Sequence, residues 1–406
     1  MTSTAVVTGI GVVAPNGLGA AAYWAALLGG ASGIGRISRF DPGGYPVRRA
    51  GEIRGFAAGD HVPGRVIVET DRWTHFALAG TAMALEDAGA DLSVLPEYDL
   101  AVVTASSSGG NEFGQREIER LWAEGARRVS AYQSIAWFYA ASTGQISIRH
   151  KLRGPCGVIA TEQAGGIDAI ASARRSIRAG ARLVVTGGTE APLSPYALTT
   201  QLATGLLSTG EDGAYQPFGR AARGFLPGEG GAMLVVEDGT RGGARPYGTI
   251  AGYGASFDPH PSTGRPPGLR RAVETALADA GLAPGDVGVV FADAMGVPAA
   301  DRRESAAIAG VFGPHGVPVT APKTLTGRLY AGGAALDVAT ALLALRHQVI
   351  PHTTGVGEVD PAHPIDLVTG RPRPARLRHA LVIARGHGGF NAALVVSSAL
   401  GNHPPP

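Results

Sequence analysis

The stretch AGGIDAIASARRSIRAGARLVVTGG, residues 164–188, decides the fold that we expect for this chain. Small residues open it, a long amphipathic pattern follows and an apolar run closes it, which predicts a tight turn, a helix and a buried strand. A second stretch, AGGAALDVATALLALRHQVI at residues 331–350, repeats the small-residue turn and the long helix. This self-similarity indicates an internal duplication.

Two further pairs of segments keep the same order along the chain. The segment ALEDAGADLSVLPEYDLAVVTASSSGG from Ala84 is matched by ALADAGLAPGDVGVVFADAMG from Ala276, and the strand RLVVTGGTEA is matched by HALVIARGHGG. Chance would rarely preserve the order of three pairs. The sequence therefore predicts two related α/β halves, residues 1–246 and 247–406, joined by the Gly- and Arg-rich segment DGTRGGARP.

Short β-branched runs followed by Gly or Ser predict the strands. The clearest of these runs are Ala5–Thr8, Leu100–Val103, Leu183–Val185, Val289–Phe291 and Leu381–Ile383. Because they alternate with helices of ten or more residues, we expect mainly parallel pairing and sheets that are covered on both faces. The Pro- and Gly-rich segment FDPHPSTGRPPG predicts a loop, and GNHPPP predicts a disordered tail.

Composition excludes several classes of function. A formal net charge of +2 leaves no electrostatic footprint for nucleic acid, and the apolar runs are too short and broken to span a membrane. No signal peptide is evident, and the single cysteine, Cys156, allows no intramolecular disulfide, so we expect a cytoplasmic protein.

No histidine pair has metal-ligand spacing, and the glycines of GIGVVAPNGLG are spaced wrongly for a dinucleotide. We expect no metal and no cofactor.

The turn before residue 165 is a place where enzymes position nucleophiles. Free backbone N–H groups at a helix N-terminus acidify a thiol and stabilise an oxyanion. Residue 163 at this turn is glutamine, whose carboxamide cannot attack a thioester at a useful rate. The sequence thus predicts a nucleophile's position that lacks a nucleophile.

Several segments resemble the ketosynthase branch of the thiolase-like enzymes over essentially the whole chain. They are VVTGIGVVAPNGLG, YQPFGRAARGFLPGEGGAMLVVED and RGHGGFNAALVV. The segments SIAWFYAASTGQISIRH, TEQAGGIDA, VVFADAMGVP and PKTLTGRLYAGG resemble more narrowly the chain-length factor, the ketosynthase-like partner subunit of type II polyketide synthases. The resemblance implies a five-layer αβαβα sandwich of two duplicated halves.

The resemblance also implies that the catalytic positions are lost. Gln163 replaces the catalytic cysteine, Asp293 in ADAMGV replaces the first histidine, and Arg328 in KTLTGR replaces the second, while Val297 stands where threonine belongs. Asp293 would repel a developing enolate, and Arg328 cannot act as a neutral hydrogen-bond partner. Their opposite charges suggest an ion pair that seals the site. Lys323 and Glu304 match a supporting ion pair of the family.

Two roles for Gln163 stay open. Some ketosynthase-like loading domains carry glutamine here and decarboxylate malonyl thioesters, but they keep the histidines. The alternative is that Gln163 satisfies buried backbone groups at the turn.

In the chain-length factors, the helix after the Ser-rich strand end lines a channel at the heterodimer interface. The three bulk-setting positions transfer onto Asn111, Gly114 and Ile118, which share one helix face. Because factors for shorter products tend to have aromatic residues at the first and third position, the resemblance implies a chain longer than an octaketide.

The resemblance implies two protein partners. The first is a catalytic ketosynthase subunit, which would supply the cysteine and histidines, with Trp137, Phe138 and Tyr139 as interface anchors. The second is an acyl carrier protein, which would deliver malonyl units on a phosphopantetheine arm. A scaffold without influence on chain length is the other open role.

Three further features have less specific interpretations. Cys156 in GPCGV is interpreted as a small buried hydrophobe, and His387 in RGHGGF as a turn residue near the pocket mouth. Arg174, Arg175 and Arg178 are interpreted as a solvated helix face, with an acidic carrier protein as the alternative contact.

Overall fold

The computed structural model describes residues 3–210, 213–240 and 246–399, and its two halves have the same strand order. The first half contributes β1 (Ala5–Ala14), β5 (Leu100–Ala105), β6 (Cys156–Ile159), β7 (Leu183–Glu190) and β8 (Gly230–Asp238). The second contributes β9 (Gly248–Phe257), β10 (Val289–Phe291), β11 (Pro318–Thr320), β15 (His379–Arg385) and β16 (Phe390–Ser398). The orders β1-β8-β7-β5-β6 and β9-β16-β15-β10-β11 correspond strand for strand, which confirms the predicted duplication.

The strands of both halves form one twelve-stranded sheet. Antiparallel pairs Val6↔Thr249 and Val7↔Gly248 join β1 to β9, while β13 (Asp366–Leu367) extends β11 and β2 (Gly17–Leu18) pairs with β1. Pairing is parallel toward both ends of the sheet and antiparallel through its centre, so the expectation of mainly parallel pairing was wrong. The reason is plainest at β15 and β16, where a short turn returns the chain beside its own strand without a crossover helix.

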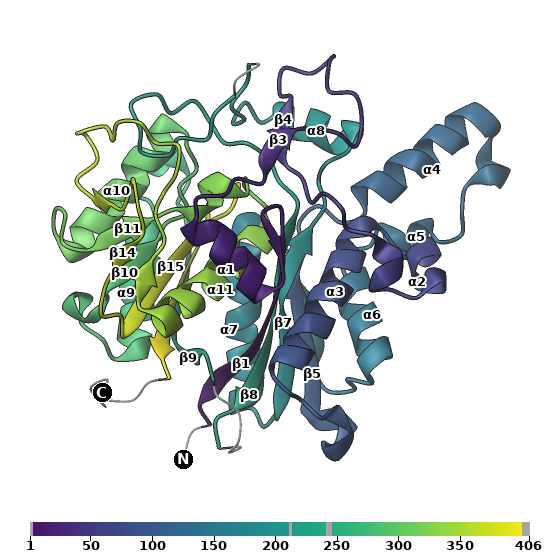
Figure 1. Ribbon diagram of the computed structural model, residues 1–406, viewed down its shortest axis with the longest axis horizontal. Coiled ribbons are helices and arrows are strands. Elements are labelled where there is room, and N and C mark those ends of the chain that lie inside the picture. The colour runs from purple at the N-terminus through teal and green to yellow at the C-terminus, as the bar shows by residue number, and fades with distance from the viewer. Residues whose placement is uncertain (1–2, 211–212, 241–245, 400–406) are drawn as a thin grey trace.

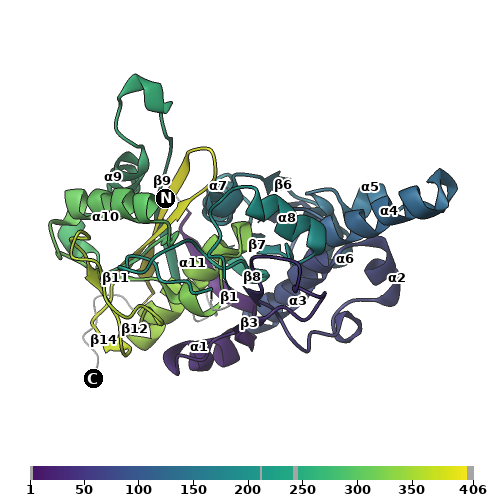
Figure 2. The same cartoon turned by 90° about the horizontal axis from the view of Figure 1, so that it is seen from above.

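The two halves of this sheet form two β layers, with helices between them and on both outer sides, which gives the αβαβα arrangement (Figures 1 and 2). Two central helices, α7 (Gly165–Arg178) and α11 (Ala331–His347), contact strands of both halves. On the outer face of the first half lie α3 (Arg72–Asp87) and α6 (Ala141–His150), and beside the second half lie α9 (Leu269–Ala280) and α10 (Pro298–Phe312). The fold is thiolase-like, as the sequence predicted.

Small residues at the starts of α7 and α11 allow the central layer to form. A Cβ atom on Gly166 would lie 2.4 Å from the carbonyl oxygen of Ala331, and one on Gly332 would lie 2.1 Å from that of Gly230. The backbones at these two contacts therefore approach more closely than a side chain on Gly166 or Gly332 would allow. This contact explains why the repeated AGG segments mark the fold.

The remaining elements lie around this framework. They are α1 (Ala20–Leu28), α2 (Gly64–Glu69), α4 (Asn111–Glu124), α5 (Gln133–Ala136), α8 (Pro195–Leu202), β3 (Ile34–Arg36), β4 (Arg49–Gly51), β12 (Val349–Ile350) and β14 (Arg373–Pro374). Short 3₁₀ turns span Ala58–Asp60, Leu92–Val94, Glu97–Asp99, Ala126–Arg128, Glu162–Ala164, Pro261–Thr263, Pro284–Asp286 and Pro322–Leu325. Helix α4 projects from the body of the molecule, with α5 at its base (Figures 1 and 2).

All five predicted strand runs lie within strands. The predicted loop at 257–268 is irregular apart from the end of β9 and the turn Pro261–Thr263. Residues 241–245 of the predicted linker and the whole of GNHPPP lie outside the described residues. Within the described ranges, no helix is long and apolar enough to cross a membrane.

The interpretation of Cys156 was wrong, and that of a solvated arginine face holds for Arg175 and Arg178, which are exposed, but not for Arg174. Cys156 is exposed, because β6 is the last strand of the sheet and nothing covers it in the described chain. Arg174 is buried rather than solvated, since its guanidinium pairs with Asp279 and donates to the carbonyl oxygen of Ala251 at 2.7 Å.

Candidate functional site

The turn between β6 and α7 places Gln163 in the interior. Glu162 has a left-handed backbone conformation with φ of 51°, and the 3₁₀ turn Glu162–Ala164 then leads into α7. Gln163 is fully buried against Gly333 of α11, where a Cβ atom would lie 2.7 Å from Gln163 Nε2. Neither amide atom of Gln163 has a hydrogen-bond partner among the described residues. The expectation that this amide satisfies buried backbone groups was therefore wrong.

Asp293 and Arg328 form the expected ion pair. Arg328 donates from Nη2 to Asp293 Oδ1 at 3.0 Å and from Nη1 to Asp293 Oδ2 at 3.1 Å, and both side chains are buried. Arg328 also donates to the carbonyl oxygens of Asp293 and Arg385, and the backbone N–H of Arg385 donates to Asp293 Oδ1 at 3.0 Å. The pair is thus hydrogen-bonded on both sides, as a buried ion pair must be if it is to persist.

The ion pair expected between Lys323 and Glu304 is absent from the described residues. Lys323 Nζ instead pairs with Asp337 of α11 at 2.6 Å and donates to the carbonyl oxygen of Asp293 at 3.1 Å. The Glu304 carboxylate accepts the backbone N–H groups of Asp293 and Ala294 at 2.7 and 2.9 Å. Because the Glu304 carboxylate is already hydrogen-bonded to these two backbone N–H groups, Lys323 pairs with the Asp337 carboxylate instead.

Burial and charge fix the protonation states of this network. Burial opposes ionisation of Asp293, but Arg328, followed by Lys323 and Arg385, outweighs it and lowers the Asp293 pKa. Burial also opposes the charge on Arg328, yet Asp293 and Glu162 raise the Arg328 pKa. Burial, helped by the negative charge of Asp293, raises the Glu304 pKa to about 7. Asp293 and Arg328 are therefore both favoured in their charged forms inside the protein.

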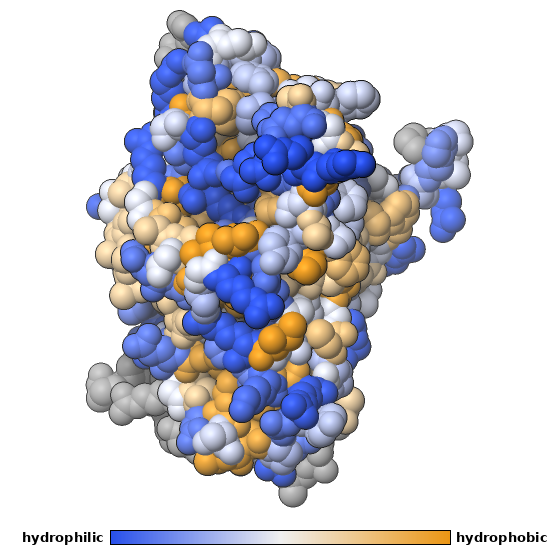
Figure 3. All heavy atoms as spheres, turned by 90° about the vertical axis from the view of Figure 1, so that its right-hand side faces the viewer, coloured by the Kyte–Doolittle hydropathy of each residue, from blue (hydrophilic) through white to orange (hydrophobic). Residues whose placement is uncertain are grey.

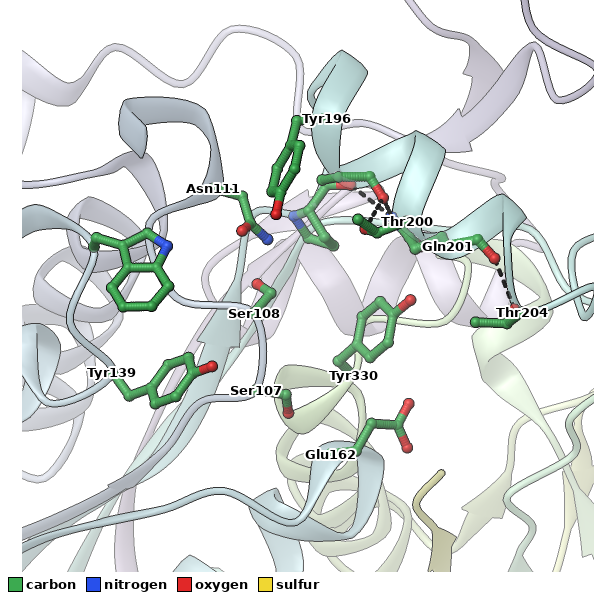
Figure 4. A pocket seen from close by; sticks show the side chains of 13 residues that line it. Ser107, Ser108, Asn111, Tyr139, Glu162, Tyr196, Thr200, Gln201, Thr204 and Tyr330 are labelled. Carbon is green, nitrogen blue, oxygen red and sulfur yellow. Dashed lines mark hydrogen bonds between the residues drawn. The ribbon is translucent and has the colours of Figure 1, made fainter. Parts of the chain in front are cut away.

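A polar pocket opens beside this sealed site (Figure 4). Its volume is about 320 Å³, and its lining comes from the end of β5, the start of α4, α8 and the turns that carry Glu162 and Tyr330. The lining residues are Ser107, Ser108, Asn111, Trp137, Tyr139, Glu162, Pro192, Tyr196, Ala197, Thr200, Gln201, Thr204 and Tyr330. Gln163 is not among them, so the pocket stops short of the amide.

Buried Glu190 holds the Ser-rich rim of this polar pocket in place. Its carboxylate accepts the backbone N–H groups of Ser107 at 2.5 Å and Ser108 at 3.3 Å, and the Ser108 hydroxyl at 2.6 Å. Burial raises the Glu190 pKa to about 7 despite these hydrogen bonds.

The three predicted channel residues lie together. Asn111, Gly114 and Ile118 line one cavity of about 270 Å³, the α4 cavity, together with Gln115, Gln133, Trp137 and Tyr196. Tyr196 and Gln133 were not predicted from the sequence to lie here. No spacing rule could have found Tyr196, because only the tertiary fold brings α8 against α4, where Gln115 Oε1 accepts the Tyr196 backbone N–H at 2.9 Å.

Trp137, Phe138 and Tyr139 are exposed to 48%, 56% and 37% in the single chain. They follow α5 on the side that carries α4, and Figure 3 shows apolar patches between polar side chains on this side of the molecule. His387 is exposed on the β15–β16 turn, where its backbone N–H donates to Glu162 Oε2 at 2.9 Å.

The fold and the site together define a ketosynthase-like protein in which a buried glutamine occupies the turn before α7. A family model for the N-terminal domain of β-ketoacyl synthases matches residues 3–241, and one for the C-terminal domain matches residues 247–357. The chain is 57% identical to the tetracenomycin polyketide synthase ketoacyl synthase β subunit of Streptomyces glaucescens, covering 96% of this chain and 97% of that one. It is 53% identical to the actinorhodin polyketide β-ketoacyl synthase 2 of Streptomyces coelicolor, with the same coverage.

Among solved structures, the ishigamide ketosynthase/chain length factor superposes with a TM-score of 0.91 at 28% identity, over 98% of this chain and 100% of that one. The chain therefore belongs to the β-ketoacyl synthase family, in its branch of ketosynthase β subunits, or chain-length factors, of type II polyketide synthases.

Proposed function

We propose that this chain performs no condensation by itself and sets polyketide length as the partner of a catalytic ketosynthase subunit. One observation carries the first part: a buried, bidentate Asp293–Arg328 ion pair stands beside a fully buried glutamine where the reaction needs a thiolate and two imidazoles. The partner would supply those groups. An acyl carrier protein would bring malonyl units on its phosphopantetheine arm.

Exposed aromatic side chains support the heterodimer. Phe138 and Trp137 are about half exposed in the single chain, and β6 ends the sheet with partly exposed residues. Aromatic residues of this kind are enriched at the centres of protein interfaces, where they lose contact with water.

The α4 cavity supports a role in chain length. Asn111 and Ile118 are smaller than the aromatic residues expected for shorter products, and Gly114 between them packs against Trp137, 3.1 Å from where its Cβ would lie. We therefore propose a product longer than an octaketide.

The test is reconstitution of the heterodimer with the carrier protein and malonyl units, followed by mass analysis of the released chains. Asn111→Phe and Ile118→Phe should shorten the products. Ala123→Phe, at an exposed position of the same helix outside the cavity lining, is the matched control. Unchanged products from both cavity variants would remove the role in length and leave a scaffold.

A second arm tests the absence of catalysis. The purified chain, incubated with malonyl carrier protein, should yield no acetyl product, because Gln163 is fully buried and the pocket ends at Glu162 and Tyr330. Acetyl carrier protein formed without the partner would identify the chain as a glutamine-type decarboxylase instead.

A further inference from the structure

The polar pocket and the α4 cavity meet at one wall. Asn111, Trp137 and Tyr196 line both of them, and each comes from a different segment of the chain. In Figure 4, Asn111 and Tyr196 lie at one end of the polar pocket, while Glu162 lies at the opposite end. A ligand that passes between these three wall residues would leave one cavity and enter the other.

The volumes favour joint use of the two cavities. Binding sites for small molecules usually occupy about 300–1,000 Å³. The α4 cavity, at about 270 Å³, is smaller than this range, and the polar pocket, at about 320 Å³, is at its lower limit. The combined volume of the two cavities falls well inside this range. A long chain therefore has room only if it uses both cavities.

The lining of the polar pocket suits an oxygen-rich chain. The side chains of Asn111, Tyr139 and Tyr330 face the pocket, and none of them takes part in a hydrogen bond within the described residues. All three can donate to a carbonyl oxygen. Gln201, which also lines the pocket, is 5% exposed, and its Oε1 has no partner there. This oxygen can accept from the enol form of a β-ketone.

The far end of the pocket is fixed by a hydrogen bond. The backbone N–H of His387 donates to Glu162 Oε2 at 2.9 Å, so the Glu162 side chain is held at the end of the pocket. A chain with a carbonyl on alternate carbons would thus meet the donors Asn111, Tyr139 and Tyr330 in the pocket, whereas a saturated acyl chain would leave them unpaired.

We propose that the polar pocket is a second chamber for the growing chain, which holds the distal, oxygen-rich segment of chains too long for the α4 cavity. This inference rests on the proposed function. Asn111, Trp137 and Tyr196 form the passage between the chambers, and Glu162 and Tyr330 close the far end.

Adjacent threonines on α8 offer a matched test. Thr200 lines the polar pocket and Thr199 does not, yet both are exposed and each donates its hydroxyl to a backbone carbonyl of its own helix, at 2.8 and 2.9 Å. In the reconstituted heterodimer, Thr200→Trp should shift the product distribution toward shorter chains, while Thr199→Trp should leave it as in the wild type. Thr204→Trp, which fills the pocket from beyond the end of α8, should act like Thr200→Trp.

The outcomes separate this inference from the proposed function. One outcome is that Asn111→Phe shortens the products while Thr200→Trp and Thr204→Trp both behave like the control. In that case the polar pocket is not a second chamber, but the proposed role of the chain in setting product length is retained. If neither Asn111→Phe nor Thr200→Trp changes the products, the proposed function itself fails. Loss of all products from an intact Thr200→Trp heterodimer would also overturn the chamber, because short chains should still form.

Discussion

Arg328 makes two hydrogen bonds to the carboxylate of Asp293, and the backbone N–H of Arg385 donates to the same carboxylate. Neither charge reaches solvent, since Arg328 is 1% exposed and Asp293 is fully buried. Each therefore depends on the other for its charge compensation. This mutual dependence can be tested by substitution.

Removal of one partner should cost far more than removal of both charges. Arg328→Met leaves Asp293 buried and unpaired, and we expect the complex to lose about 3–5 kcal/mol of stability. The double variant Asp293→Asn with Arg328→Met should lose less, because no net charge remains. Denaturant unfolding of the purified heterodimer measures both values. Equal losses in the single and double variants would show that the pair is not energetically coupled.

Replacing Gln163 by an apolar residue should stabilise the protein, because the Gln163 amide has no hydrogen-bond partner among the described residues. Gln163→Met keeps the length of the side chain and removes two buried polar atoms that lack partners. A buried unsatisfied polar group costs about 1–3 kcal/mol, so the variant should unfold at higher denaturant concentration than the wild type. Gln201→Met is the comparison, because Gln201 Nε2 donates to the carbonyl oxygens of Pro192 and Ala197 and its loss should destabilise. A destabilised Gln163→Met would mean that the amide has a partner after all.

Glu190 should make stability depend on pH. Its pKa is about 7 in the folded chain, above its ordinary value of 4.5, so the folded state holds the proton more tightly than the unfolded state. The contribution of Glu190 is therefore greatest below pH 4.5 and is lost as the pH rises toward 7, by up to about 3 kcal/mol. Between pH 4.5 and 7, the melting temperature of Glu190→Gln should fall less than that of the wild type. Parallel melting curves for the two proteins would contradict this account.

The exposed aromatic segment predicts a specific defect in assembly. Phe138→Asp places a charge on a side chain that is 56% exposed in the single chain, and its desolvation on binding should weaken the heterodimer. Co-purification with the catalytic subunit and sedimentation analysis measure the effect. Val94→Asp changes an apolar residue outside this segment that is exposed to 67%, and it should not alter assembly. Full recovery of the Phe138→Asp heterodimer would place the interface elsewhere.

Local sequence patterns were enough to predict the strands and the internal duplication. Runs such as Val289–Phe291 are short, apolar and β-branched, and such runs form buried strands wherever the chain places them. The pairing direction was wrong, because antiparallel neighbours such as β15 and β16 depend on which strands meet, and this is not encoded in any single run.

The site was predictable only in part. Opposite charges at Asp293 and Arg328 allowed their contact to be predicted once the family resemblance aligned them. Lys323 was assigned to Glu304 although it pairs with Asp337, because a buried cation takes the carboxylate that the backbone has left free. The prediction that Cys156 is buried was wrong, because the local sequence does not reveal that β6 is an edge strand.

By itself, the sequence determined that the turn before α7 carries no nucleophile at position 163, because a glutamine carboxamide is not a nucleophile in any fold. It also determined the two repeated halves, because strand and helix patterns are local. Only the tertiary structure decided that Tyr196 joins Asn111 at a wall between two cavities, and that the Gln163 amide is left without a partner. Such relations depend on how distant segments pack, and packing is a property of the whole folded chain.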